Sequence, residues 1–385
     1  MADPKLSSPA RRTRRTRFVC ISDTHNCTVR LPKGDVLIHC GDLTNQGSFN
    51  ELSKQVSWLE RADFECKIVV AGNHDFALDT DFYNTWAAYG RFQTPQGPGE
   101  CQALLTGSPS LTYLLHERRT IKLTSPSGPR TTFSVFGSPY SLAWGGAWAF
   151  QYPRPESDGS AAAAARALWG AIPLDTDILI THGPARTHCD EAGTREAAGC
   201  EVLRQHLWRV RPRLALCGHI HEARGAERVR WDLGSRHARY AELGRTPWRD
   251  PDPESERNAL VDLSAKGGAP LDNDGSACLS SEGLDDYGDQ RHGSERGNTG
   301  AEGEGGSGGA IAYPGIGTLG LGEDPDSARS DRVALAGRLG RKETCIVNCA
   351  IQHSSYPHAG RGPRRLNKPI VVDLDLPVWE DEDAA

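Results

Sequence analysis

Short apolar runs recur along the chain, and several of them end in a cluster of polar residues. Residues 67–71 read KIVVA, a pattern that predicts a short buried strand. Gly72, Asn73, His74 and Asp75 follow at once, so an amide, an imidazole and a carboxylate emerge together where the strand ends. Open α/β sheets place their ligand chemistry at this edge. Taken alone, the stretch fits an ordinary polar surface turn equally well.

The same pattern predicts further strands and three helices. The helical spacing of Leu52, Val56 and Leu59 indicates a helix over 48–63, with Ser48 as its candidate N-terminal cap. Helices are also expected over 161–169 and 200–210. The predicted strands cover residues 18–21, 36–40, 67–71, 111–115, 119–123, 132–136, 177–181, 214–217, 344–351 and 369–374. The strand–helix–strand order at the start favours a parallel sheet.

Residues 251–340 break this pattern. They hold 19 of the 42 glycines, many Ser, Asp and Glu residues, and few large apolar side chains. Such a segment cannot bury enough surface to offset the entropy of ordering it, so we expect it to be disordered. The predicted organisation is a basic disordered tail (1–16), one domain (17–245), a disordered insertion (246–342), closing strands of the same domain (343–378) and an acidic tail (379–385).

Composition narrows the classes of function. The 385-residue chain has a net charge of −6, which argues against general nucleic-acid binding. We expect no membrane span, because no apolar run approaches the roughly 18 residues that a span needs, and no apolar signal core follows the N-terminus. The eleven cysteines form no CxxC pair, which favours a reduced, intracellular compartment. We therefore expect a cytoplasmic protein, with the arginine-rich residues 11–17 leaving nuclear import open.

Five polar motifs each close an apolar strand. They are Asp23-x-His25, Gly41-Asp42, Gly72-Asn73-His74-Asp75, His182-Gly183 and Gly218-His219-x-His221. In an extended segment Asp23 and His25 point the same way, because they are two residues apart. Carboxylate oxygens, imidazole nitrogens and an amide oxygen together suit divalent ions such as Mn, Fe or Zn. Any one motif is a weak signal, but five in this order predict one metal centre rather than five unrelated surface turns.

This set of motifs resembles that of the calcineurin-like metallophosphoesterase superfamily. The wider pattern is similar to its metallophosphoesterase-domain-containing branch, through IHCGD at 38–42, GSP at 137–139, the loop at 144–154, THGP at 181–184, GC at 199–200, RP at 211–212 and NKPIV at 367–371. The similarity covers about residues 17–232 and 343–378. It implies an α/β fold in which a β-sandwich of two mixed sheets is flanked by helices, a four-layer αββα arrangement.

The resemblance also implies roles for the motif residues around two divalent metal ions, with Mn favoured over Fe and Zn. Asp23, His25 and His221 would hold the first ion, Asn73, His182 and His219 the second, and Asp42 would bridge the two. The catalytic residues would be His74, which would steady the phosphoryl oxygens or protonate the leaving oxygen, and Asp75, which would orient the His74 imidazole. Many relatives in this branch have Glu where Asp75 stands.

A loop rich in glycine and tryptophan, residues 141–155, is the candidate substrate wall. Its candidate substrate-binding residues are Trp144, Trp148 and Arg154, because large aromatic side chains in such a loop are hard to bury entirely. Aromatic rings of this kind suit stacking on a base.

Together these features favour a dinuclear phosphoesterase that hydrolyses a small phosphodiester or phosphomonoester, with nucleotides among the candidate substrates. The reading implies in-line attack by a hydroxide that bridges the two ions. The main alternative is a metal-binding scaffold with vestigial catalysis, whose protein partner would bind the insertion. A phosphoprotein phosphatase is a second alternative. The presence of both His74 and His219 argues against the scaffold.

Overall fold

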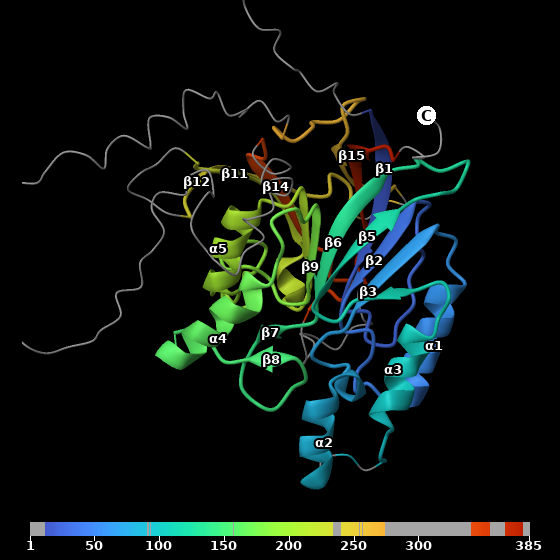
Figure 1. The fold of residues 1–385 in the computed structure, drawn as a ribbon, viewed down its shortest axis with the longest axis vertical. Coiled ribbons are helices and arrows are strands. Elements are labelled where there is room, and N and C mark those ends of the chain that lie inside the picture. Colours follow the sequence, from blue (N-terminus) through green and yellow to red (C-terminus); the bar gives the residue numbers. More distant parts are fainter. Residues whose placement is uncertain are drawn as a thin grey trace, which may run out of the picture.

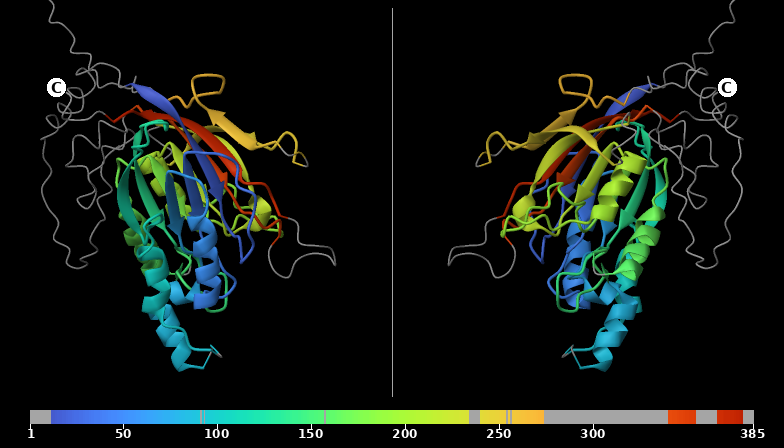
Figure 2. Two further views of the ribbon diagram at one scale, coloured as in Figure 1. Left: turned by 90° about the vertical axis from the view of Figure 1, so that its right-hand side faces the viewer. Right: turned by 90° about the vertical axis from the view of Figure 1, so that its left-hand side faces the viewer.

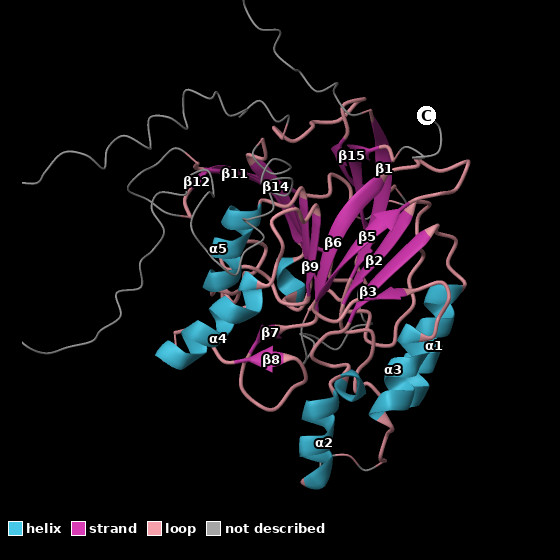
Figure 3. Ribbon diagram, in the orientation of Figure 1, coloured by secondary structure: helices cyan, strands magenta, loops and turns pink. Residues whose placement is uncertain are grey.

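Two β-sheets pack face to face in the computed structural model, and helices cover the outer face of each sheet (Figure 1). The structure describes residues 12–379 apart from 91, 93, 157, 234–239, 254, 256, 274–339 and 355–365. Figure 3 shows the strands in the middle of the molecule, with helices on both sides of them. The predicted four-layer α/β fold is therefore confirmed.

The first sheet has six strands in the order β13-β15-β1-β2-β3-β4. They are β1 (Thr13–Ile21), β2 (Val36–Cys40), β3 (Cys66–Val70), β4 (Thr112–Tyr113), β13 (Ala259–Leu263) and β15 (Ile370–Pro377). Strands β1 to β4 are parallel, whereas β15 runs antiparallel to β1. The ends of β1, β2 and β3 therefore lie at the same edge, as the strand–helix–strand order predicts.

The second sheet has seven strands in the order β12-β11-β14-β10-β9-β6-β5. They are β5 (Glu117–Lys122), β6 (Thr132–Ser138), β9 (Ile178–Thr181), β10 (Leu214–Cys217), β11 (Gly225–Trp231), β12 (Glu242–Trp248) and β14 (Glu343–Asn348). The central strands β6, β9, β10 and β14 are parallel. A parallel bridge between Ser22 and Ala350 joins the ends of β1 and β14, so the two sheets meet at their carboxyl edges.

The helices divide between the two outer faces, as the side views in Figure 2 show. On the first sheet lie α1 (Phe49–Glu60), α2 (Thr80–Ala88), α3 (Pro98–Thr106) and the short 3-10 helix η1 (Phe76–Leu78). On the second sheet lie α4 (Gly159–Gly170) and α5 (Glu201–Val210). Ser48 and Glu51 form a reciprocal capping box at the start of α1, which confirms Ser48 as its cap. Within the described residues, the helices are all too short or too polar to cross a membrane.

Both faces of the first sheet are buried, which explains the continuous apolar runs of its strands. In β1, Phe18 and Cys20 face the layer between the sheets, whereas Val19 and Ile21 face the helices. This alternation follows from the two-residue period of a strand. The short pair β7 (Ser141–Leu142) and β8 (Gln151–Tyr152) lies outside both sheets, in the loop predicted as the substrate wall.

Two segments predicted to be disordered contain strands. Residues 13–16 belong to β1 and pair with β15, and the Arg17 guanidinium binds the Asp373 carboxylate through two contacts of 2.7 Å. Strand β13 lies inside the predicted insertion and pairs in parallel with β15, with Val261 and Leu263 in the core. The prediction is wrong for both segments. Residues 13–16 have no apolar side chain, but β15 supplies backbone partners for all four of them. In β13 the apolar residues alternate, so one face of this short strand can pack on the core. Residues 1–11, 274–339 and 380–385 of the predicted tails and insertion lie outside the described residues.

Candidate metal centre

The carboxyl edges of the two sheets bring together all the residues predicted as metal ligands. Asp23 and His25 follow β1, Asp42 follows β2, Asn73 follows β3, His182 follows β9, and His219 and His221 follow β10. Parallel strands end at one edge, so motifs far apart in the sequence become neighbours there. The strand-end placement inferred from the sequence is what the structure shows.

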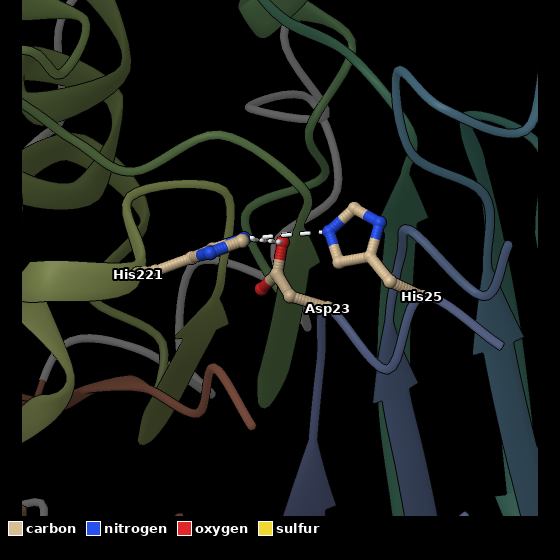
Figure 4. A group of neighbouring side chains, drawn as sticks. All are labelled: Asp23, His25 and His221. Atoms are coloured by element: carbon tan, nitrogen blue, oxygen red, sulfur yellow. Dashed lines mark hydrogen bonds and ion pairs between the residues drawn. The ribbon is translucent and has the colours of Figure 1, made fainter. Parts of the chain in front are cut away.

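Asp23, His25 and His221 form the first of three groups of side chains that could hold a metal ion; Asp42, His182 and His219 form the second, and His25, Asp42 and His74 the third (Figure 4 shows the first). Nε2 of His221 lies 3.3 Å from Oδ1 of Asp23 and 3.4 Å from Nε2 of His25. All three side chains are buried. In Figure 4 the two imidazoles approach the carboxylate from opposite sides, one from the end of β1 and one from the 3-10 helix η2 (His221–Ala223).

Asp42, His182 and His219 form the second group, with donor atoms within 4.8 Å of one another. Oδ1 of Asn73 lies 3.0 Å from Nε2 of His182 and so joins this group. Oδ2 of Asp42 lies 3.4 Å from Nε2 of His182 and 3.6 Å from Nε2 of His25. Asp42 therefore stands between the two groups.

Backbone carbonyls fix the orientation of four imidazoles at the centre. The Nδ1 contacts are His25 to Thr44 O at 3.2 Å, His74 to Asn45 O at 2.9 Å, His182 to Cys40 O at 2.9 Å and His221 to Ser354 O at 3.0 Å. A carbonyl oxygen only accepts, so Nδ1 carries the proton in each ring. This leaves Nε2 as the nitrogen available to the centre, the arrangement that metal-binding histidines commonly show.

The backbone at the centre adopts conformations that side chains usually avoid. Asp23, His25, Asp42 and His219 all have positive φ, at 54°, 43°, 54° and 67°. Such strain persists where the surrounding structure enforces it, typically at functional sites. A Cβ on Gly218 would lie 2.2 Å from Oδ2 of Asp23, so any larger residue before His219 would clash with this carboxylate.

Buried carboxylates control the charge of the centre. Burial raises the pKa of Asp42, but the surrounding histidines, His182 foremost, together outweigh this effect, and the pKa lies well below its usual value. Burial lowers the pKa of His182, yet Asp42 and Asp23 together with the Cys40 carbonyl reverse this shift and bring the pKa to about 9. Burial also lowers the pKa of His221, but Asp23, with smaller contributions from the Ser354 carbonyl and Asp42, outweighs it and brings the pKa to about 9. Burial dominates at His219, whose pKa falls to about 3. The carboxylates thus favour positive charge beside them.

The donor set fits divalent cations. Imidazole Nε2 atoms, two buried carboxylates and one amide oxygen converge, and this mixture suits Mn, Fe or Zn. Nε2 of His25 and Nε2 of His221 face each other at 3.4 Å, so a proton or a metal ion must lie between their lone pairs. Because Asp42 reaches both groups, the set is suited to two cations that share one carboxylate.

His74 also lies at the centre. Its ring meets that of His25 edge to face, with centroids 4.7 Å apart, and a nitrogen of it lies within 4.8 Å of donor atoms of His25 and Asp42. The backbone N–H of His74 donates to Oδ1 of Asp42 at 2.8 Å. The structure therefore places His74 close enough to act beside the ligands.

Asp75 does not orient the His74 imidazole. Its carboxylate accepts hydrogen bonds from the backbone N–H groups of Gly72, Leu43 and Thr44 at 2.9–3.2 Å, and from the Thr44 hydroxyl at 2.7 Å. The predicted role of Asp75 is therefore wrong. The buried N–H groups of the two tight turns need an acceptor, and Asp75 supplies it. It holds the loop that carries Asp42 against the loop that carries Asn73.

The three predicted substrate-binding residues occupy two places. Trp148 packs against the His74 ring, with centroids 4.6 Å apart. Trp144 and Arg154 line a hollow of about 650 Å³ with Ala143, Gly145, Arg186, Glu196 and Ala197. The Arg154 guanidinium lies over the Trp144 ring at 4.8 Å. One aromatic side chain of the loop thus contacts the metal centre, and another lines a hollow.

Sequence reasoning missed the groups that hold the ligand loops. Nδ2 of Asn348 donates to the carbonyl oxygens of Gly218 and Ile220 at 3.4 and 2.8 Å, on either side of His219. The carbonyls that receive the histidine Nδ1 protons leave no trace in the sequence, because every residue has one. Asn348, a polar residue within an apolar run, is the one signal that could have been found.

Comparisons with known proteins agree with this geometry. A family model described as calcineurin-like phosphoesterase matches residues 16–223. Metallophosphoesterase domain-containing protein 1 of Homo sapiens is 35% identical over 237 residues, 58% of this chain and 66% of that protein. A UPF0046 protein of Caenorhabditis elegans is 35% identical over 224 residues, 57% of this chain and 68% of that protein. A probable rhamnogalacturonate lyase C of Emericella nidulans is 39% identical over 234 residues, 60% of this chain.

The extent of these matches determines what they show. The match covers 20% of the lyase, and about two thirds of the human and nematode proteins. The residues that the family model matches include all five strand-end motifs, from Asp23 to His221. The chain therefore belongs to the calcineurin-like phosphoesterase family, in the branch of the metallophosphoesterase domain-containing proteins.

Proposed function

We propose that this chain is a dinuclear metal-dependent phosphoesterase that hydrolyses a small phosphate monoester or diester. The observation that carries the proposal is the position of Asp42, whose Oδ2 lies 3.6 Å from Nε2 of His25 and 3.4 Å from Nε2 of His182. One carboxylate shared by two groups of ligands is what a pair of cations about 3.5–4 Å apart requires. Membership of a phosphoesterase family supports the class of reaction.

Each ligand has a role in this proposal. Asp23, His25 and His221 would hold one cation, Asn73, His182 and His219 would hold the other, and Asp42 would serve both. Mn is the metal we propose, because the carboxylate and amide oxygens suit it, although the imidazoles suit Fe and Zn as well. When bound, such a pair of cations lowers the pKa of a water and offsets the charge of the phosphoryl group.

His74 acts on the reacting phosphate rather than on the metal. Its Nδ1 donates to the Asn45 carbonyl, so its Nε2 is free to contact a phosphoryl oxygen or to give a proton to the leaving oxygen. Asp75 supports this arrangement without touching the His74 ring. Its carboxylate binds the N–H of Thr44, two residues after Asp42, and the N–H of Gly72, just before Asn73.

Nucleotides are among the candidate substrates. The half-exposed Trp144 ring and the Arg154 guanidinium line one hollow, a pairing that suits an aromatic base and an anionic group. A protein partner for residues 246–342 and a cytoplasmic or nuclear location stay predictions.

Two matched histidine variants test the enzyme against the metal-binding scaffold. His74→Ala should keep two metals and lose about 10²–10⁴-fold in kcat, with a smaller change in KM. His219→Ala should instead lose one metal and recover part of its activity in excess Mn. The measurements are metal content and kcat on a panel of phosphate monoesters, diesters and nucleotides, over a range of added Mn.

Two results would overturn the proposal. If His74→Ala loses metal as His219→Ala does, His74 is a ligand and its assigned role is wrong. If the wild-type protein holds two metals but hydrolyses no ester of the panel, the scaffold becomes the better description.

A further inference from the structure

Trp148 and His74 form the closest ring pair between the loop at 141–155 and the metal centre. Their centroids are 4.6 Å apart and their planes are tilted by 42°. The His25 and His74 rings meet edge to face, with centroids 4.7 Å apart and planes at 88°. The Nδ1 of His74 is held by the Asn45 carbonyl at 2.9 Å. Phe76 lies nearly parallel to the His74 ring at a greater distance, with centroids 6.3 Å apart and planes at 13°. The His74 ring is thus restrained by one hydrogen bond and by three neighbouring rings, of which Trp148 is the nearest.

The backbone around Trp148 is bonded to the chain on both sides of His74. The N–H of Ala149 donates to the carbonyl of Asn73 at 3.3 Å, and the N–H of Phe150 donates to Oδ2 of Asp79 at 2.7 Å. Phe150 has a positive φ of 52°. Residues 149–150 are therefore fastened to the segment 73–79, and this places Trp148 over His74 with little freedom.

Trp148 is also packed from behind. Its ring lies 5.7 Å from that of Phe76, and Phe76 belongs to the buried cluster beneath the first sheet. The neighbouring Trp144, by contrast, is 51% exposed and lies under Arg154. Two tryptophans of one loop therefore have different surroundings, and only Trp148 is built into the support of a candidate catalytic group.

We propose that Trp148 is a positioning residue for His74, rather than a wall that binds the substrate. It holds the imidazole plane so that Nε2 stays directed at the reacting phosphate, while the Asn45 carbonyl fixes rotation about the other end of the ring. This inference rests on the proposed function, since it assumes that His74 acts on the phosphate. It replaces the substrate-binding role that the sequence suggested for Trp148.

A double-mutant cycle tests the inference. Trp148→Ala should lower kcat about 10–100-fold with a change in KM below about threefold, because misplacing a catalytic group costs turnover more than binding. In the His74→Ala background, the same change should lower kcat by less than about twofold, because the group that Trp148 positions is already absent. Trp148→Phe keeps an aromatic face and should recover most of the loss.

Trp144→Ala is the matched control, since it removes the same type of residue from the same loop. The factor by which Trp144→Ala changes kcat should be the same in the wild-type and His74→Ala backgrounds. Metal content and the thermal midpoint of each variant show whether the centre and the fold remain intact. If Trp148→Ala mainly raises KM, or if its effect multiplies with that of His74→Ala, Trp148 binds substrate and the inference is wrong.

A second readout keeps this inference separate from the proposed function. The His74 ring proton in the NMR spectrum of the metal-free or Zn-loaded protein should shift and broaden in Trp148→Ala, and stay unchanged in Trp144→Ala. This result is expected even if no tested ester is hydrolysed, in which case the proposed function fails but the packing role stands. An unchanged His74 signal in Trp148→Ala would overturn the inference directly.

Discussion

Removing residues 274–339 should leave the domain folded and slightly more stable. The two ends of this segment lie side by side, because Oδ1 of Asn273 accepts hydrogen bonds from the backbone N–H groups of Lys342 and Glu343 at 2.8 and 3.0 Å. An eight-residue Gly/Ser linker spans such a gap with ease, since an extended residue covers about 3.3 Å. The excision tests whether the glycine-rich segment is independent of the metal centre, as its composition predicts.

The expected gain follows from the loop length. Replacing 274–339 with eight residues shortens the connection about eightfold, and each halving removes about 0.6 kcal/mol of loop-closure cost. Three halvings give a gain of about 2 kcal/mol, or a rise of about 4–8 °C in Tm. Leu263→Ala in β13 is the comparison variant for a loss of stability. It leaves a cavity at a buried position and should lower the free energy of unfolding by about 2–5 kcal/mol.

Thermal unfolding and Mn-dependent ester hydrolysis provide the assay. The excised protein should keep its metal content and kcat, and Leu263→Ala should lower Tm equally in the full-length and excised proteins. If the excision unfolds the domain or lowers Tm, the segment contributes to the core and the compositional reasoning is wrong. If Leu263→Ala has no effect in either background, β13 is not part of the folded sheet.

Two further changes probe the centre and its surroundings. Asp42→Asn should lose at least one metal and nearly all turnover, because a neutral amide cannot offset two dications; two retained metals with near-normal rates would remove Asp42 from its bridging role. His188 is buried, and although burial alone would lower its pKa, Glu227 at 2.6 Å and Glu242 at 3.2 Å raise it above the usual 6.5. The stability that this pairing adds is present below about pH 6.5 and is lost as pH rises through the raised pKa, so Glu227→Gln should cost more unfolding free energy at pH 6 than at pH 9. An equal cost at the two values would show that His188 stays neutral.

The position of the candidate metal ligands could be predicted from the sequence, because each of them lies a few residues after an apolar strand. Asp42 follows the end of β2 by two residues and His182 follows β9 directly, so the strand pattern alone places them at one edge. The fold class could be predicted from the same strand pattern. The role of Asp75, a neighbour of a candidate ligand in the sequence, could not be predicted. Its carboxylate accepts from the backbone N–H groups of Leu43 and Thr44, and no sequence pattern indicates that these groups need an acceptor.

The two tryptophans of the loop show why side-chain roles are less predictable than ligand positions. Trp144 and Trp148 are four residues apart, and composition gives both the same exposed role. Gly145 and Gly146 adopt positive φ, at 75° and 67°, and turn the chain between them. Trp148 is consequently brought to His74, whereas Trp144 lies under Arg154. Strand β13 was missed for a related reason, because its alternating apolar residues lie within a long polar stretch.

The part of the chain after the glycine-rich segment completes the metal centre rather than merely closing the sheets. Ser354 supplies the carbonyl that fixes His221, and Asn348 ties the carbonyls on both sides of His219. The Ser22–Ala350 bridge joins the residues that follow β14 to Ser22, the residue before Asp23. Asn273 binds the backbone of Lys342 and Glu343, so the point where the chain re-enters the second sheet is fixed by residues outside 274–339. It follows that changes within the segment should be tolerated, whereas shifting β14 by one residue would misdirect both histidines of the Gly-His-x-His motif.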